Sequence, residues 1–273
     1  MSQSSLPSRG VLVTGASRGV GAAVAGAFAR RGDRVVVHHR SAQSSDRADA
    51  VAGGLPGEGH AVVAADLSDP EAVRLLAAEA ALALGRVDVL VNNAAMIVAP
   101  SEVRGSRRGD HPLEQTSYED WVEVWERTIA TNLLGPANLT WCVARAMIDV
   151  PPADGLPVGR IVNVGSRGAY RGEPDIPAYG ASKAGLHAFG QSMAQRLAPH
   201  GIAVTSIAPG FIATEMAGPA LKGAAGDATR AQSPFHRVAT PEEVADAVVT
   251  LASPGAEWAS GAVIDFNGAS HLR

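Results

Sequence analysis

The sequence predicts an α/β protein built on one doubly wound, parallel sheet of about seven strands with helices on both faces. Short apolar runs rich in β-branched residues alternate along the chain with stretches of helical periodicity. Most of these runs are apolar nearly throughout, which is typical of parallel strands covered on both faces. No internal repeat or linker divides the chain, so we expect a single domain over residues 9–273.

Seven segments have the composition of buried strands. In chain order they are GVLVTG (10–15), RVVVHH (34–39), HAVVAAD (60–66), VDVLVNNAA (87–95), GRIVNVGS (159–166), IAVTSIAPG (202–210) and AVIDFNG (262–268). Helical patterns between them, such as residues 21–32 and 70–85, end at glycine, where helices commonly stop. Asp69 and Pro70 predict the start of the second of these helices, with Asp69 as its N-cap.

Composition and charge exclude several classes of protein. The 273 residues are 46% hydrophobic, enough for a substantial core, and the formal charge of −4 argues against a nucleic-acid binder. No apolar run is long enough to span a membrane, and Cys142, the only cysteine, leaves no intrachain disulfide. We therefore expect a cytoplasmic protein without nucleic-acid or membrane partners.

Three segments are expected to lie outside the regular sheet and helices. Residues 1–8 have no apolar signal core and are expected to form a disordered tail. Residues 97–118 and 149–159 are long polar connections, which we interpret as surface insertions.

The first predicted strand leads directly into TGASRGVG (14–21), with Gly15, Gly19 and Gly21, and then into a helix. Glycines allow the backbone to approach a pyrophosphate closely, while the helix N-terminus offers free N–H groups. A tight strand-to-helix turn without a ligand is the plainer alternative. The same letters fit the G-x-S-x-G nucleophile elbow with Ser17 as nucleophile, but hydrolases need several strands before it and here there is one.

Tyr179 and Lys183, in YGASKAG (179–185), lie four positions apart and share one face of a predicted helix. Taken alone, the pair is equally typical of a polar helix surface. A free tyrosine titrates near 10, too high for efficient proton exchange at neutral pH, but a neighbouring ammonium favours the phenolate. We therefore expect Lys183 to lower the pKa of Tyr179.

Together these motifs resemble the short-chain dehydrogenase/reductase family, in particular its NADP-dependent carbonyl and 3-oxoacyl reductases. NNAA (92–95), PGFIAT (209–214), the stretch 237–268 and Ser166, thirteen residues before Tyr179, belong to the resemblance, which covers the chain from residue 9 onward. Two departures from the family pattern are Ala95 in place of the usual glycine and DFNGA in place of an acidic-Gly-Gly ending. Neither removes a catalytic group.

The resemblance implies a catalytic set of Asn132, Ser166, Tyr179 and Lys183. Tyr179 would exchange the proton, and Ser166 would hold the substrate carbonyl oxygen and stabilise its developing charge. Lys183 would also bond the nicotinamide ribose, and Asn132 would anchor a proton-relay water against it. The family needs no metal, and no metal-ligand spacing is found among His111, His187, His200 and His236.

The choice of cofactor depends on the end of the second predicted strand, where an acidic residue favours NAD and basic residues accommodate the 2′-phosphate of NADP. This chain has His39, Arg40 and Ser41 at that point, and Arg18 in the glycine loop. The arginines could also be solvated surface residues, but their joint placement favours NADP(H).

The resemblance completes the expected cofactor site. Asp66 matches an adenine-contacting carboxylate, although an aspartate just before a helix is also a common cap, and Thr214 matches a threonine at the nicotinamide end. The expected cofactor-binding residues are Gly15, Ser17, Arg18, Gly19, Val20, Gly21, His39, Arg40, Ser41, Asp66, Leu67, Asn93, Ala94, Ala95, Tyr179, Lys183, Pro209, Gly210, Ile212 and Thr214.

The expected reaction is hydride transfer between NADP(H) and a small-molecule carbonyl or secondary alcohol. The alternative is a regulatory protein that binds a dinucleotide without turnover, but the implied catalytic set is complete. Arg167, Tyr170 and Arg171, together with the segment 215–237, are placed to select the substrate, which the sequence does not name. From the resemblance we expect a homotetramer with D₂ symmetry.

Overall fold

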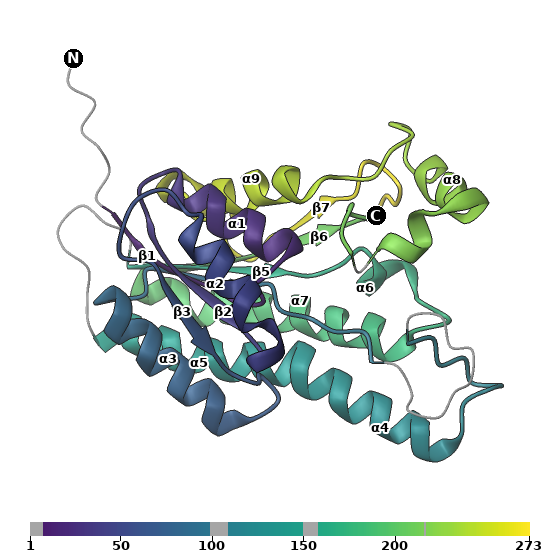
Figure 1. Ribbon diagram of the computed structural model, residues 1–273, viewed down its shortest axis with the longest axis horizontal. Helices are drawn as coiled ribbons and strands as arrows, with labels where there is room; N and C mark the ends of the chain where they lie inside the picture. The colour runs from purple at the N-terminus through teal and green to yellow at the C-terminus, as the bar shows by residue number, and fades with distance from the viewer. Residues whose placement is uncertain (1–7, 99–108, 150–157, 216) are drawn as a thin grey trace.

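The computed structural model describes residues 8–98, 109–149, 158–215 and 217–273. It contains a seven-stranded parallel sheet in the order β3-β2-β1-β4-β5-β6-β7 (Figure 1), which confirms the predicted fold class. The strands are β1 (Gly10–Val13), β2 (Arg34–His39), β3 (Ala61–Ala64), β4 (Val89–Asn92), β5 (Gly159–Val164), β6 (Ile202–Pro209) and β7 (Val263–Phe266). Each lies within a segment that the sequence predicted. Except for Ser8, the expected tail lies outside the described residues, as do residues 99–108 and 150–157 of the two expected insertions.

Three helices cover one face of the sheet, the upper face in Figure 1: α1 (Gly19–Ala29), α2 (Ser45–Gly53) and α9 (Pro241–Leu251). Val11 and Val13 of β1 pack on this side with Phe28 and Val248, and all four are fully buried. Burial of this kind stabilises the fold by about 1.5–3 kcal/mol for each large apolar side chain.

The opposite face is covered by α3 (Pro70–Leu84), α5 (Gly135–Asp149) and α7 (Pro177–Leu197) (Figure 1). Leu12 of β1, which lies between Val11 and Val13, points to this side and joins a second apolar cluster. Because successive side chains of a strand alternate between two covered faces, most of the strands are apolar over much of their length. As predicted, Asp69 caps α3, and its Oδ1 accepts a hydrogen bond from the N–H of Glu71 at 2.9 Å.

The helix α4 (Tyr118–Ile129) continues into α5 through a π-helical turn, Ala130–Leu134. A π turn inserts an extra residue into the helix and is frequent at functional sites. The remaining helical elements are α6 (Gly168–Arg171), α8 (Gly223–Ala231) and the short turns Ala42–Ser44, Ala198–His200, Gly218–Leu221 and Pro254–Ala259. Within the described ranges, no helix has the length and apolar character needed to cross a bilayer.

The strand order reverses between β1 and β4, which lie side by side at the centre of the sheet. In open parallel sheets, ligands bind outside the carboxyl ends of the strands at such a switch point. The glycine loop follows β1 at this edge, and Asn93 follows β4.

Candidate active site

A cavity of about 720 Å³ lies at the carboxyl ends of β1, β2, β4, β5 and β6. This volume is in the usual range for small-molecule and cofactor sites. Its wall contains every site residue expected from the sequence except Asn132 and Asp66. Segments that are far apart in the sequence, between Gly15 and Glu215, therefore meet at one place.

The glycine loop has the shape of a cradle for a phosphate. Gly15 and Gly19 have φ of +63° and +56°, values that side chains rarely tolerate, and a Cβ on Gly21 would lie 2.3 Å from the carbonyl oxygen of Gly15. Within the described part of the chain no side chain caps the N-terminus of α1, so its leading N–H groups are available to an anion. The loop is anchored by Asn93, whose Nδ2 donates to the carbonyl oxygen of Thr14 at 2.8 Å. These residues fit the pyrophosphate of a dinucleotide.

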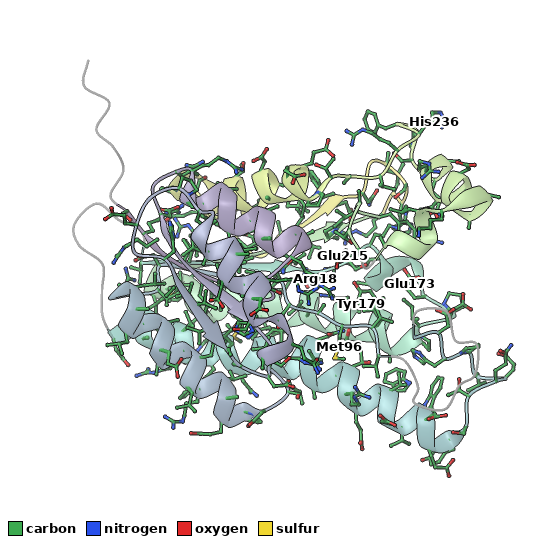
Figure 2. The ribbon with its side chains drawn as sticks, in the orientation of Figure 1. Arg18, Met96, Glu173, Tyr179, Glu215 and His236 are labelled. Carbon is green, nitrogen blue, oxygen red and sulfur yellow. The ribbon has the colours of Figure 1, made fainter. Side chains whose placement is uncertain are left out.

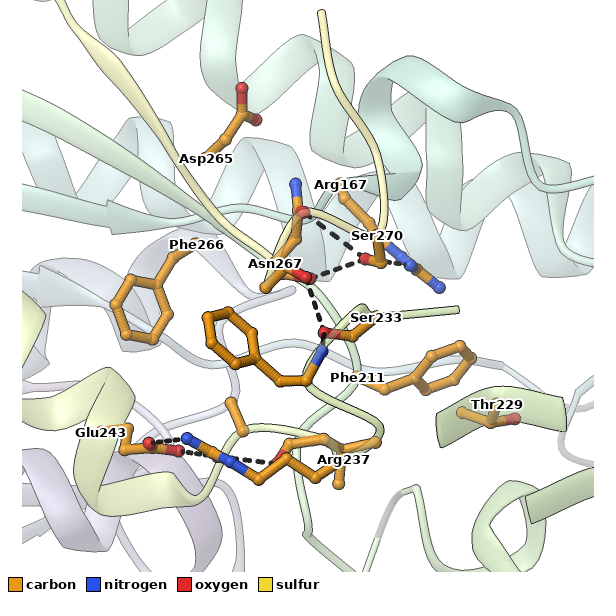
Figure 3. A pocket seen from close by; sticks show the side chains of 14 residues that line it. Arg167, Phe211, Thr229, Ser233, Arg237, Glu243, Asp265, Phe266, Asn267 and Ser270 are labelled. Atoms are coloured by element: carbon orange, nitrogen blue, oxygen red, sulfur yellow. Dashed lines mark hydrogen bonds and ion pairs between the residues drawn. The ribbon is translucent and has the colours of Figure 1, made fainter. Parts of the chain in front are cut away.

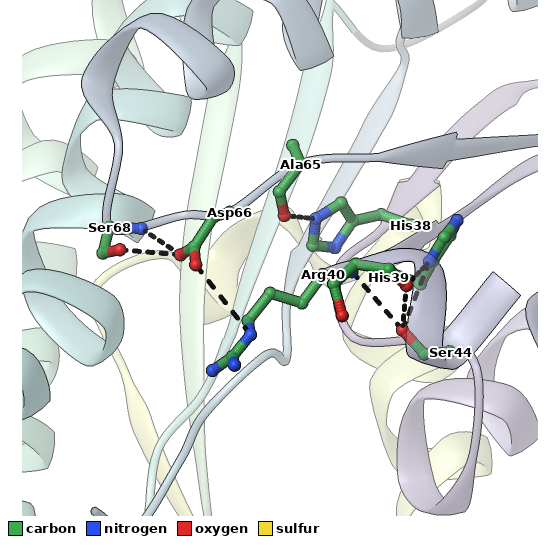
Figure 4. A network of polar contacts seen from close by, with 8 residues as sticks. His38, His39, Arg40, Ser44, Ala65, Asp66 and Ser68 are labelled. Atoms are coloured by element: carbon green, nitrogen blue, oxygen red, sulfur yellow. Dashed lines mark hydrogen bonds and ion pairs between the residues drawn. The ribbon is translucent and has the colours of Figure 1, made fainter.

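His38, which sequence reasoning missed, links the glycine loop to the second strand. Its Nδ1 accepts a hydrogen bond from the N–H of Gly15 at 3.0 Å, and its Nε2 donates to the carbonyl oxygen of Ala65 at 2.9 Å (Figure 4). Burial lowers the pKa of His38 to about 4, so the ring is neutral at physiological pH and can fill both roles. A histidine inside an apolar strand run was the available signal, because a buried ring needs partners.

The end of β2 carries the groups expected to select the cofactor (Figure 4). Arg40 Nε lies 3.9 Å from Asp66 Oδ2, a loose contact between two half-exposed side chains. Asp66 is not the cap of α3; its Oδ1 accepts hydrogen bonds from the Ser68 N–H at 2.9 Å and hydroxyl at 2.7 Å. Burial alone would raise the pKa of Asp66, but these bonds and Arg40 hold it below its usual value. Asp66 lines an adjoining cavity of about 290 Å³, which shares Arg40, Met96 and Thr131 with the main one.

Ser166, Tyr179 and Lys183 meet on the other side of the main cavity. Ser166 follows the end of β5, and its Oγ accepts the N–H of Gly168 at 3.0 Å. Tyr179 is the third residue of α7 and Lys183 lies one turn later, with 2% of its surface exposed. Lys183 Nζ donates to the carbonyl oxygen of Val164 at 2.8 Å and lies 5.9 Å from the centre of the Tyr179 ring.

The expected direction of the pKa shift of Tyr179 was wrong. Burial raises the pKa of Tyr179 to about 12, against the opposing effect of the Ser166 hydroxyl. Burial also lowers the pKa of Lys183 to about 8. The ammonium is directed at the Val164 carbonyl rather than at the phenol, so desolvation dominates. At neutral pH the phenol keeps its proton and can act as a donor.

Asn132 lies in the π turn and is fully buried behind the cavity. Its Oδ1 accepts the N–H of Met96 at 2.9 Å, and its Nδ2 donates to the Met96 carbonyl at 2.9 Å and to Ser182 Oγ at 3.2 Å. The side chain thus holds the segment after β4, which contributes Met96 to the cavity wall. Its expected role in holding a relay water against Lys183 stays a prediction.

Arg18 is joined to Glu215 by an ion pair of 2.9 Å across the mouth of the cavity (Figure 2). Sequence reasoning missed Glu215, which follows Thr214 directly, because an exposed glutamate in a connection carries no pattern of its own. Other cavity-lining residues that were missed are Gln43, Ser44, Arg47, Ala65, Met96, Thr131, Val164, Gly165 and Ala213. Among the described residues, no group of three or more His, Cys, Asp or Glu side chains is placed to hold a metal ion.

Comparisons with known proteins agree with this geometry. Residues 15–271 match the family model described as enoyl-(acyl carrier protein) reductase. The chain is 36% identical over 261 residues to the 3-oxoacyl-[acyl-carrier-protein] reductase FabG of Vibrio cholerae, covering 96% of each chain. It is 34% identical over 257 residues to D-threitol dehydrogenase of Mycolicibacterium smegmatis, covering 94% of this chain and 90% of the relative.

Solved structures show the same fold over nearly the whole chain. A short chain dehydrogenase from Burkholderia cenocepacia, crystallised in complex with NADP, superposes with a TM-score of 0.81 at 30% identity, covering 98% of this chain and 100% of that one. A blue fluorescent protein from a metagenomic library, in complex with NADPH, superposes with a TM-score of 0.80 at 29% identity, over 98% of this chain and all of that one. The chain is a member of the short-chain dehydrogenase/reductase family.

Proposed function

We propose that this protein is an NADPH-dependent carbonyl reductase that also works in reverse as an alcohol dehydrogenase. One observation carries the proposal: Ser166, Tyr179 and Lys183 line the same cavity as the glycine loop. A dinucleotide whose pyrophosphate lies at the loop has its other end directed toward these three side chains. A regulatory protein without turnover has no need of this arrangement.

The chain's own residues can perform the proton chemistry of the reduction. Bound NADPH would supply the hydride to the carbonyl carbon. The Ser166 hydroxyl holds the carbonyl oxygen and stabilises the charge that develops on it. Tyr179 donates its proton to that oxygen, and Lys183, still cationic at pH 7, stabilises the phenolate that remains. Positioned acid catalysis of this kind is worth on the order of 10²–10⁴ in rate.

NADPH is proposed over NADH because positive groups surround the adenosine end of the cavity. Arg40 and Arg47 line it, and the end of β2 carries no carboxylate that would repel a 2′-phosphate. The NADP and NADPH complexes of the two similar structures support the same choice.

Two of the relatives are named for their substrates, which are a 3-oxoacyl thioester on a carrier protein and a polyol. Both undergo interconversion of a carbonyl and a secondary alcohol, which is the chemistry proposed here. The test is a panel of ketones and secondary alcohols assayed with NADPH, NADH and their oxidised forms. We expect turnover with at least one carbonyl class and a preference for NADPH; no turnover across the panel, with cofactor binding intact, would contradict the proposal.

We further propose a cytoplasmic homotetramer with D₂ symmetry. The strand β7 is at the edge of the sheet, and Ile264 on it and the nearby Trp258 are exposed, the latter completely. Trp141 on α5 is also 68% exposed. Apolar surface of this kind is typical of interfaces between subunits. Light scattering should give the mass of four chains, and a monomer at micromolar concentration would contradict the assembly; the single cysteine supports the cytoplasmic location.

A further inference from the structure

The segment between Ser166 and Tyr179 carries a carboxylate next to the reaction site. Glu173 follows α6 after a turn at Gly172, where φ is +75°. A Cβ built on Gly168 would lie 2.5 Å from Glu173 Oε1, so the carboxylate rests directly against the Gly168 backbone. That same residue donates its N–H to Ser166 Oγ.

Glu173 also contacts the start of α7. A Cβ on Gly180, the residue after Tyr179, would lie 3.6 Å from both Cβ and Cγ of Glu173. The negative charge of Glu173 contributes to raising the pKa of Tyr179, which places the carboxylate within electrostatic reach of the phenol. Glu173 therefore borders both proposed catalytic groups, and Figure 2 shows it beside Tyr179.

The carboxylate has no partner in the described part of the chain: no hydrogen bond or ion pair engages it. It is half-buried, and burial raises its pKa against the opposing effect of Arg171 and Arg167. A half-buried carboxylate that no protein donor engages is free to accept a hydrogen bond from a bound ligand.

The two nearest arginines donate their hydrogen bonds to other residues. Arg167 is 4% exposed, and its Nη2 donates to Gln232 Oε1 at 2.6 Å, while Arg171 Nη1 donates to the same oxygen at 2.9 Å. Arg167 also bonds Ser270 and lies 4.9 Å from the centre of the Phe211 ring. These contacts direct it into a separate cavity of about 240 Å³ (Figure 3). Neither guanidinium neutralises Glu173 through an ion pair.

The surrounding charges indicate which donor suits this carboxylate. Arg171 and Arg167 lie within electrostatic reach of it and disfavour a substrate that carries an ammonium group. Glu173 and Asp175 disfavour a substrate that carries a carboxylate. A neutral hydroxyl group donates a hydrogen bond without either penalty.

We propose that Glu173 is a specificity-determining residue whose carboxylate accepts a hydrogen bond from a hydroxyl group carried by the substrate close to its reacting carbonyl. Hydroxylated ketones are then the preferred substrates. The hydride passes from NADPH to the carbonyl carbon and the proton from Tyr179 to its oxygen, giving NADP⁺ and a diol. The inference rests on the proposed carbonyl reduction and names its substrate class.

The test compares kcat/KM for two ketones that differ in one hydroxyl, acetoin and butanone, with NADPH as cofactor. A hydrogen bond to a charged group should favour acetoin roughly ten- to hundredfold in the wild type. Glu173→Leu should bring the ratio of the two kcat/KM values to within about threefold of one. Glu173→Gln should give an intermediate ratio, because its amide oxygen still accepts a hydrogen bond.

The neighbouring Asp175→Asn is the matched control, since Asp175 is exposed and its contact with His111 is made by the backbone carbonyl. It should keep the wild-type ratio. The proposed role of Glu173 is contradicted if the wild type reduces both ketones equally, or if Glu173→Leu lowers kcat/KM for both ketones in the same proportion. Either result leaves the proposed carbonyl reduction intact. A wild type that reduces no carbonyl contradicts the proposed function itself.

Discussion

At the glycine loop, the N–H of Gly15 is bonded to His38, only 23 residues further along the chain and on the neighbouring strand. Across the cavity, Arg167 bonds Gln232 and Ser270, which are 65 and 103 residues away. The first region is built by backbone groups and glycines at fixed spacing, and the second by long side chains from separate connections. The loop of the cofactor region is therefore held in shape by its own hydrogen bonds, whereas the substrate region keeps a carboxylate, Glu173, that no hydrogen bond or ion pair engages within the described residues.

This difference implies that variants in the two regions should separate cofactor binding from turnover. The sharpest separation comes from Tyr179→Phe, which removes one hydroxyl and leaves the ring in place. Turnover should fall on the order of 10²–10⁴-fold, because the phenylalanine ring has no hydroxyl proton to donate. NADPH affinity, measured by fluorescence titration, should stay within about twofold of the wild type. A variant that keeps most of its activity would rule out Tyr179 as the proton donor.

Lys183 belongs to both regions, and its burial should cost stability. Its pKa is lowered from 10.5 to about 8, so below pH 8 the buried charge lowers the free energy of unfolding by about 3 kcal/mol. Lys183→Met should lose turnover and bind NADPH more weakly, but it should raise the free energy of unfolding at pH 7 by about 1–3 kcal/mol, after allowing for the lost bond to Val164.

The effect of the buried Lys183 charge on the free energy of unfolding should depend on pH. Between pH 8 and 10.5 the unfolded wild type binds more protons than the folded one, so wild-type stability rises with pH in that window. The advantage of Lys183→Met should therefore shrink from pH 8 to 10.5 in urea titrations. Lys222→Met, at the chain's other lysine, which is exposed, should change nothing. A Lys183→Met variant with lower stability at pH 7 and a pH profile parallel to that of the wild type contradicts the argument.

The preference for NADPH tests the adenosine end of the cofactor region. Arg40→Ala should weaken NADPH binding by about 1–3 kcal/mol, or roughly five- to 150-fold, and leave NADH binding within about twofold. Arg74→Ala, an exposed arginine paired with Glu71 on α3, is the control and should affect neither. Equal losses for both cofactors would show that Arg40 does not contact the 2′-phosphate.

The smallest effect is expected at the mouth of the cavity. The Arg18–Glu215 pair joins side chains that are 53% and 71% exposed, so it contributes little to stability. Glu215→Gln should free Arg18 for the cofactor phosphates and raise NADPH affinity about twofold to fivefold, less so at high salt. In an Arg18→Ala background the same substitution should lose this effect. A fall in affinity on Glu215→Gln in the wild-type background would show instead that the pair holds the loop in shape.

The seven strands and the glycine loop were predictable because they depend on local patterns, apolar runs and glycine spacing. His38 was missed because its role depends on Gly15 and Ala65, which follow the two neighbouring strands and are distant in sequence. Glu173 was missed because the sequence does not show that Arg167 and Arg171 donate to Gln232 rather than to this carboxylate. The pKa of Tyr179 was predicted in the wrong direction, since spacing along a helix reports proximity to Lys183 but not the desolvation of the hydroxyl.

The central claim is that the cavity transfers a hydride from NADPH to a carbonyl carbon. It is tested most directly with NADPH carrying deuterium at both C4 positions, incubated with wild-type protein and acetoin in ordinary water. Mass spectrometry of the resulting butanediol should show one deuterium on the newly formed carbinol carbon, and Tyr179→Phe should form that product far more slowly. A butanediol without deuterium, or no product while NADPH is bound, would contradict the account.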